Sequence, residues 1–166
     1  VNMPFVCEIA KKYNLKVIED SAQSIGSRLN GVPSGMYGDI GCFSTHPLKN
    51  LNACGDGGFI ITNSKKISDK ISLYRNHGFV ERNLVEHFGV VSRMDEIQAA
   101  ILKYRINNLD TVIKKRRINA AAYRDLLNSE FVYIPEEKKG EFNSYHTFVI
   151  QTSHRDALSE FLREEG

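Results

Sequence analysis

The chain has 166 residues, enough for a domain with a hydrophobic core, and its net charge is only +2 at neutral pH. No dense basic tract alternates with aromatic residues, so we expect no nucleic-acid partner, and the basic run at 114–117 fits a solvated helix face. No apolar run approaches the length of a membrane span and no signal-peptide pattern is present, so we expect no membrane partner. The three cysteines lack metal-site spacing, which predicts reduced thiols in a cytoplasmic protein without a metal.

The first part of the chain alternates helix and strand patterns. Apolar residues at helical spacing predict an amphipathic helix over about 4–13. The apolar run 15–18 then predicts a buried strand, and a second strand is expected over 40–45, after a turn at Asn30-Gly31. A helix followed by a fully apolar strand is typical of a parallel sheet, so the fold class we expect is α/β.

A glycine cluster at 55–58 precedes the next strand. We expect these glycines to permit a sharp backbone reversal into a strand over 59–62. Ser64 or Ser68 is expected to cap the helix that follows.

The second half of the chain is mainly helical by pattern. In order, we expect an irregular loop over 76–91, a capping-box start at 92–95, one long helix or two helices joined near Asn107, strands over 131–134 and 145–151, and a helix over 155–164. The helical pattern begins at the first residues of the chain, so the sequence looks like a piece of something longer.

Two residues near strand ends are candidates for chemistry. Asp20 follows the first strand, and in parallel sheets ligands lie beyond the carboxyl ends of the strands. Lys49 lies in a polar loop after the second strand, and a lysine can form an imine with a carbonyl compound when its amine is deprotonated part of the time. Spacing alone fits a surface lysine and a helix-capping aspartate better than a site.

The order of the motifs carries more information than the spacing. They are EDSAQ from Glu19, GDIGCFSTHPLKNL from Gly38, GDGG from Gly55, RNHG from Arg75, SRMDEIQAAIL from Ser92, YHTFVI from Tyr145 and HRDAL from His154. Together they resemble the DegT/DnrJ/StrS-type sugar aminotransferases, which are fold-type I enzymes that use pyridoxal 5'-phosphate.

The resemblance implies a cofactor site with four residues. Lys49 matches the lysine that forms the Schiff base and carries a proton between donor and cofactor carbons. Asp20 matches the carboxylate that pairs with the pyridine nitrogen, Gln23 the amide beside the ring hydroxyl, and Ser44 a phosphate ligand.

The resemblance also implies a fold and an assembly. We expect part of a fold-type I fold, with a mixed, mostly parallel sheet, in which residues 1–106 belong to the large cofactor-binding domain. Residues 107–166 would form the connecting helix and the start of a small α+β domain. The family works as a homodimer in which the loop before SRMDEIQAA reaches the partner's site, and Val91 stands where many members have an asparagine that touches the partner's cofactor phosphate.

The function implied is transfer of an amino group from glutamate or glutamine to a keto group of a nucleotide-linked deoxysugar, for cell-surface polysaccharide (such as lipopolysaccharide) or antibiotic sugars. A related sugar dehydratase, an aminocyclitol aminotransferase and an inactive dimerising fragment stay open, although the dehydratases typically have His at the position of Lys49. Of the histidines, His46 and His77 are candidates to assist proton transfer, although packing roles fit them better. We expect His87, His146 and His154 to be structural.

Overall fold

The computed structural model describes residues 1–127 and 130–166. Its central sheet has three strands in the order β1 (Ile18–Asp20), β4 (Ile40–Ser44) and β5 (Gly58–Ile61). β1 runs parallel to β4, and β5 runs antiparallel to β4, so the expected mixed sheet is confirmed, with one strand pair of each kind within these residues. Phe43 of β4 stacks on its cross-strand partner Phe59 of β5, with ring centroids 4.8 Å apart.

A second, smaller sheet links distant parts of the chain. β2 (Arg28–Leu29) and β3 (Val32–Pro33) form a hairpin, and β8 (Glu141–Phe142) pairs with the other edge of β2. The expected turn at Asn30-Gly31 is confirmed, because φ is +50° and +81° at these two residues, as a two-residue turn with both φ positive requires.

The helices of the first half follow their capping residues. α1 (Met3–Lys12) begins after Asn2, whose side chain accepts a hydrogen bond from the Phe5 N–H, and the chain leaves it through Asn14 at a φ of +52°. α2 (Lys65–Tyr74) is capped by Ser64 and not by Ser68, since the Ser64 hydroxyl accepts from the Ile67 N–H.

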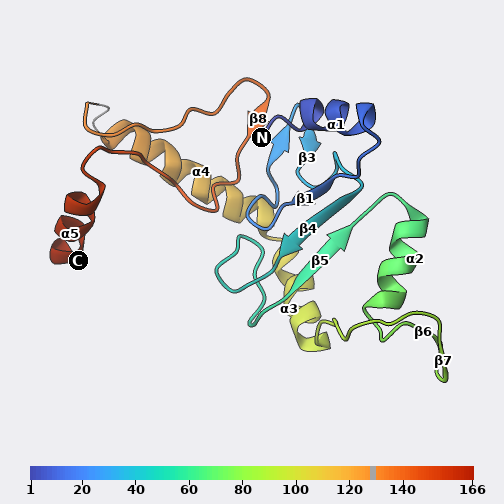
Figure 1. The fold of residues 1–166 in the computed structure, drawn as a ribbon. Coiled ribbons are helices and arrows are strands. Elements are labelled where there is room, and N and C mark those ends of the chain that lie inside the picture. Colours follow the sequence, from blue (N-terminus) through green and yellow to red (C-terminus); the bar gives the residue numbers. More distant parts are fainter. Residues whose placement is uncertain (128–129) are drawn as a thin grey trace.

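In the described part of the second half, three more helices follow. α3 (Glu96–Ile106) and α4 (Leu109–Leu126) are separate helices, so of the two alternatives expected the structure has two helices joined near Asn107. α4 leads away from the central sheet toward α5 (Arg155–Glu165), which confirms the last predicted helix (Figure 1). No helix within the described ranges is both long and apolar enough to cross a membrane.

Four expectations about local structure are wrong. The segment 76–91 is not irregular throughout, since it contains the exposed hairpin of β6 (Phe79–Glu81) and β7 (Leu84–Val85). The expected strands over 131–134 and 145–151 are reduced to one bridge between Tyr133 and Gln151. α3 starts at Asp95 without a side-chain capping bond, so 92–95 does not form the expected capping box.

The fourth correction concerns the first strand. It begins at Ile18 instead of residue 15, and Ile18 is 66% exposed, whereas the neighbouring Glu19 is buried. Burial of Glu19 has a clear cause: its two carboxylate oxygens accept hydrogen bonds from the backbone N–H groups of Gly35, Tyr37 and Gly38. A charged side chain therefore takes the inward position that an apolar side chain was expected to fill.

Candidate functional site

Lys49 lies in a loop of residues 45–57 that joins β4 to β5, which we call the lysine loop. The base of this loop is closed by backbone hydrogen bonds from the Thr45 N–H to the Gly57 oxygen (2.8 Å) and from the Ala53 N–H to the Thr45 oxygen (2.7 Å). The Lys49 N–H bonds to the His46 oxygen (2.8 Å), so the lysine sits on a turn of its own. Asn50 beside it is buried, and Lys49 itself is half-buried. The amine is thus carried by an anchored loop.

The glycines at the end of the lysine loop and the start of β5 let the backbone pass close to neighbouring atoms. The expected reversal into the strand after the glycine cluster is confirmed, since β5 runs antiparallel to β4, although none of Gly55, Gly57 and Gly58 has a positive φ. A Cβ on Gly57 would lie 2.7 Å from the Thr45 hydroxyl oxygen, and one on Gly58 would lie 2.6 Å from the Phe43 carbonyl oxygen. Only glycine lets the two ends of the loop come this near each other.

Asp20 and Ser44 share one edge of the central sheet. Each is the last residue of its strand, β1 and β4 are parallel neighbours, and Asp20 stands opposite Cys42 in the register. The carboxyl ends of parallel strands meet at the same edge, which is also where the lysine loop begins. Asp20 is exposed and one carboxylate oxygen accepts from the Ala22 N–H (3.1 Å), while the Ser44 hydroxyl accepts from the His46 N–H (3.3 Å).

Gln23 and Asp20 line different hollows. The Gln23 side chain is exposed and lines a hollow of about 340 Å³ together with Tyr145 and His146. Asp20 lines a different hollow, of about 630 Å³, with Ser21 and Ser24. The structure therefore places Asp20 and Ser44 at one edge of the sheet, and Gln23 and His146 in one hollow, while the roles of Lys49, Asp20, Gln23 and Ser44 stay predictions.

His146, expected to be structural, lies within hydrogen-bond distance of the Lys49 amine. Its Nε2 lies 3.5 Å from Lys49 Nζ, across 97 positions of sequence. The YHTFVI motif was the one available signal, but a motif does not say what its histidine touches. Sequence analysis therefore missed this pair.

The environment of His146 disfavours a charged ring. Burial lowers the pKa of His146, and the positive charges of Lys49 and then Arg116 lower it further. Its Nδ1 is buried and has no hydrogen-bond partner among the described residues. His146 is therefore neutral at pH 7, and its Nε2 faces the amine of Lys49.

The other candidates from the sequence have local partners. His46 accepts from the Leu48 N–H at Nδ1 (3.2 Å), and its Nε2 lies 3.8 Å from Asp56. His77 packs its ring against Phe79, with centroids 5.3 Å apart. Val91 forms a single bridge with Asn76 and is exposed. Within the described part of the chain, no group of three or more His, Cys, Asp or Glu side chains is arranged to hold a metal ion.

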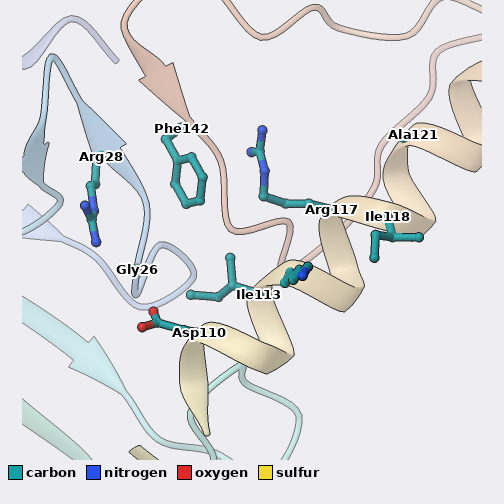
Figure 2. A pocket seen from close by; sticks show the side chains of 9 residues that line it. Gly26, Arg28, Asp110, Ile113, Arg117, Ile118, Ala121 and Phe142 are labelled. Carbon is teal, nitrogen blue, oxygen red and sulfur yellow. The ribbon is translucent and has the colours of Figure 1, made fainter. Parts of the chain in front are cut away.

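A separate cavity of about 570 Å³ lies between α4 and the small sheet and contains none of the predicted site residues. Figure 2 shows Arg28 and Phe142 on one side, Arg117 and Ile118 on the helix, and Ile113 pointing toward Gly26. The Arg117 guanidinium lies 4.3 Å from the Phe142 ring centroid and forms a two-bond ion pair with Glu137. This region fixes α4 against the small sheet.

These features define a class of protein: an α/β chain with a lysine on an anchored loop beside two polar strand ends. Residues 1–166 match the model of the DegT/DnrJ/EryC1/StrS aminotransferase family, and the chain belongs to this family.

Members of this family resemble the chain both in sequence and in fold. A protein of Acidithiobacillus ferrooxidans named UDP-N-acetyl-3-dehydro-alpha-D-glucosamine 3-aminotransferase is 40% identical over 165 residues, which cover 99% of this chain and 45% of that protein. The crystal structure of S. venezuelae DesV superposes with a TM-score of 0.94 at 32% identity, covering 99% of this chain and 45% of that one. The structure of NtdA from Bacillus subtilis, described with bound cofactor PMP, has a TM-score of 0.82 at 33% identity and covers 96% of this chain and 37% of that one.

The chain spans less than half the length of these relatives. The fold is therefore part of the aminotransferase fold, over a region that includes the lysine loop.

Proposed function

We propose that the full-length protein containing this chain is an aminotransferase that uses pyridoxal 5'-phosphate and holds the cofactor at the lysine loop. The observation that supports the proposal is that Asp20 and Ser44 end two parallel neighbouring strands at one edge of the central sheet, where the loop that carries Lys49 begins. An amine, a carboxylate and a hydroxyl match the aldehyde, the pyridine nitrogen and the phosphate of that cofactor, so the donor set fits. The family membership of the whole chain supports the same conclusion.

Each residue has a role in this proposal. When bound, the cofactor supplies an aldehyde that joins to amines and a ring that withdraws electrons. Lys49 provides the amine that holds the aldehyde carbon and moves a proton at Nζ. Asp20 keeps the pyridine nitrogen protonated, Ser44 donates to the phosphate, and Gln23 lies beside the ring hydroxyl.

We propose a keto group on a nucleotide-linked deoxysugar as the acceptor and glutamate or glutamine as the donor. The support is that similar proteins are named as aminotransferases of UDP- and dTDP-linked amino sugars. The division into a cofactor-binding domain (1–106) and the start of a second one (107–166), the cytoplasmic location, a homodimer, and a role in cell-surface or antibiotic sugars belong to the same proposal. In such a dimer Val91 would offer the partner only an apolar contact.

The test uses the full-length protein with a matched pair of lysine variants. Purified wild type is expected to show the absorbance band of lysine-bound cofactor and to aminate members of a panel of dTDP- and UDP-ketosugars. Lys49→Ala is expected to abolish both, whereas Lys66→Ala, which changes an exposed lysine of α2, should change neither. A band that persists in Lys49→Ala, or no band in wild type, would contradict the proposal.

A further inference from the structure

The segment 143–146 is held by hydrogen bonds to three parts of the chain: Ser27, the lysine loop and α4. The Ser144 N–H donates to the Ser27 hydroxyl (3.0 Å), and the two serine hydroxyls bond to each other (2.8 Å). Asn50 of the lysine loop donates from Nδ2 to the Ser144 carbonyl oxygen (3.0 Å). Arg116 of α4 donates to the carbonyl oxygens of Tyr145 and His146 (3.1 Å each). Ser144 is fully buried, so these bonds fix the backbone just before His146.

Tyr145 adds a backbone constraint to this clamp. Its φ is +47°, a left-handed conformation that aromatic residues rarely adopt, and it persists because its surroundings hold it. Tyr145 is buried, its hydroxyl accepts from Arg124 (2.9 Å), and its ring lies 5.6 Å from the Arg117 guanidinium. The turn at Tyr145 directs the following residue, His146, toward the lysine loop.

The result is a neutral imidazole facing the amine. A neutral ring that accepts a hydrogen bond at Nε2 from Lys49 Nζ must carry its own proton on Nδ1. Nδ1 is buried and has no hydrogen-bond partner among the described residues. The hydrogen bond that the ring makes within this part of the chain is therefore the one at Nε2.

The geometry points to His146 as a positioning residue: its neutral Nε2 accepts a hydrogen bond from Lys49 Nζ and so orients the side chain for attack on the cofactor aldehyde. In that step the Lys49 ammonium first loses a proton to solvent, and the resulting amine would then form the C=N bond with the aldehyde carbon, whose oxygen leaves as water. This inference rests on the proposed function and adds a residue outside the predicted set. His146 acts through Lys49. By orienting the flexible four-carbon side chain, it increases the fraction of time that the amine spends in the reactive geometry.

Other charges near the ring enter any pH dependence. Lys49 and Arg116 are the cations that act on it, as described above. Arg124, Glu136, Glu137 and Glu141 line the adjoining hollow, and Glu137 is already paired with Arg117. A test must therefore separate the titration of His146 from that of the glutamates.

The test measures the rate at which cofactor-free, full-length protein attaches pyridoxal 5'-phosphate at Lys49, as a function of pH. His146→Phe keeps a ring but lacks the acceptor, and it is expected to slow attachment by about tenfold near pH 7.5, the effect of one lost hydrogen bond to a charged group. His146→Gln keeps an acceptor near the same place and is expected to stay within about threefold of wild type. His154→Gln, on the exposed start of α5, is the matched control.

The pH profile distinguishes positioning from packing. Below the pKa of His146 the imidazolium repels the lysine, so the wild-type rate should fall in a step that His146→Gln lacks, while the glutamates titrate in both proteins. Equal slowing in the Phe and Gln variants, or no slowing in either, would overturn the inference.

A second measurement does not depend on cofactor attachment. In cofactor-free protein, Lys49→Met should raise the pKa of His146, followed by NMR of the ring, because one nearby positive charge is gone. An unchanged value would show that the two side chains do not meet. If wild type never attaches the cofactor at Lys49, the proposed function fails; if it attaches normally in every His146 variant, only this inference fails.

Discussion

Asn50 donates a hydrogen bond from its side chain to the carbonyl oxygen of Ser144, 94 positions further along the chain, with the two atoms 3.0 Å apart. Both residues are buried, so the bond joins the lysine loop to the segment that carries His146 in a place that water does not reach.

Replacing Asn50 is therefore expected to destabilise the protein. Asn50→Ala leaves the Ser144 carbonyl oxygen buried and unpaired, which should lower the free energy of unfolding by about 1–3 kcal/mol in a urea titration. The control is Asn52→Ala in the same loop, whose bond to the Pro47 oxygen is short-range and exposed, with an expected change of about 0.5 kcal/mol or less. Equal effects of the two variants would contradict this account.

A side chain at Gly26 is expected to lower the free energy of unfolding, because Ile113 of α4 packs directly on this residue. Its φ is +80°, and a Cβ there would lie 2.3 Å from Ile113 Cδ1. Gly26→Ala should cost about 2–4 kcal/mol of unfolding free energy, more than Gly31→Ala, which has a φ of +81° but open space around it and should cost about 1 kcal/mol.

A second substitution isolates the packing part of this effect. Ile113→Val removes the Cδ1 atom, so it should recover part of the loss when combined with Gly26→Ala. Additive effects in this double-mutant cycle would mean that the two side chains do not compete for the same space.

The ion pair of Glu137 with Arg117 predicts a dependence of stability on pH. The hydrogen bonds from Arg117 lower the pKa of Glu137 below its ordinary value, and the Asn143 N–H adds to the effect. A lowered folded-state pKa means that the stabilisation is present above the unfolded value of about 4.3 and is lost as the pH falls through the folded value.

Glu137→Gln is the variant that tests this sign. It should reduce the free energy of unfolding by about 1–2 kcal/mol at pH 7, and the difference from wild type should shrink below about pH 4. Chemical unfolding of both proteins between pH 3 and 8 measures it, with Glu8→Gln on exposed α1 as the control. A difference that grows on acidification would contradict the assignment.

Glu19 is expected to matter for stability as a charged acceptor. In Glu19→Gln, the amide group must face at least one of the N–H donors of Gly35, Tyr37 and Gly38, because these use both carboxylate oxygens. The expected loss is about 1–3 kcal/mol of unfolding free energy, measured by urea titration. A change below about 0.5 kcal/mol, the size expected for a surface substitution, would show that the 35–38 turn does not depend on the charge.

The sequence predicted elements whose signals are local. The Asn30-Gly31 turn depends on two adjacent residues and is confirmed. Local patterns left two alternatives for the cap of α2 (Ser64 or Ser68) and for the 92–127 region (one helix or two joined near Asn107), and the structure has the Ser64 cap and two helices. The burial of Glu19 was missed because its three donors lie sixteen to nineteen positions away, and no pattern of apolar residues encodes them. The motif around Phe148 suggested a strand, but in the structure the Phe148 ring packs on Tyr123 of α4 instead of extending a sheet.

The candidate site was only partly accessible from sequence for the same reason. Strand ends and loops follow from local patterns, so the sequence predicted that Asp20 lies at a strand end and Lys49 in a loop after the next strand, while their roles stay predictions. The clamp from Ser27, Asn50 and Arg116 that brings His146 to Lys49 depends on tertiary packing over as many as 117 positions. A histidine in a recognisable motif is not assigned a neighbour until the chain has folded.

The pairing of β8 with β2 has a consequence for synthesis on the ribosome. The hairpin and the lysine loop emerge early, but the strand and the histidine that complete them emerge about a hundred residues later, since the His146–Lys49 contact alone spans 97 positions. At roughly 5–20 residues per second, about 5–20 s therefore pass between the emergence of the lysine loop and that of His146, and during this interval the contact between them cannot form.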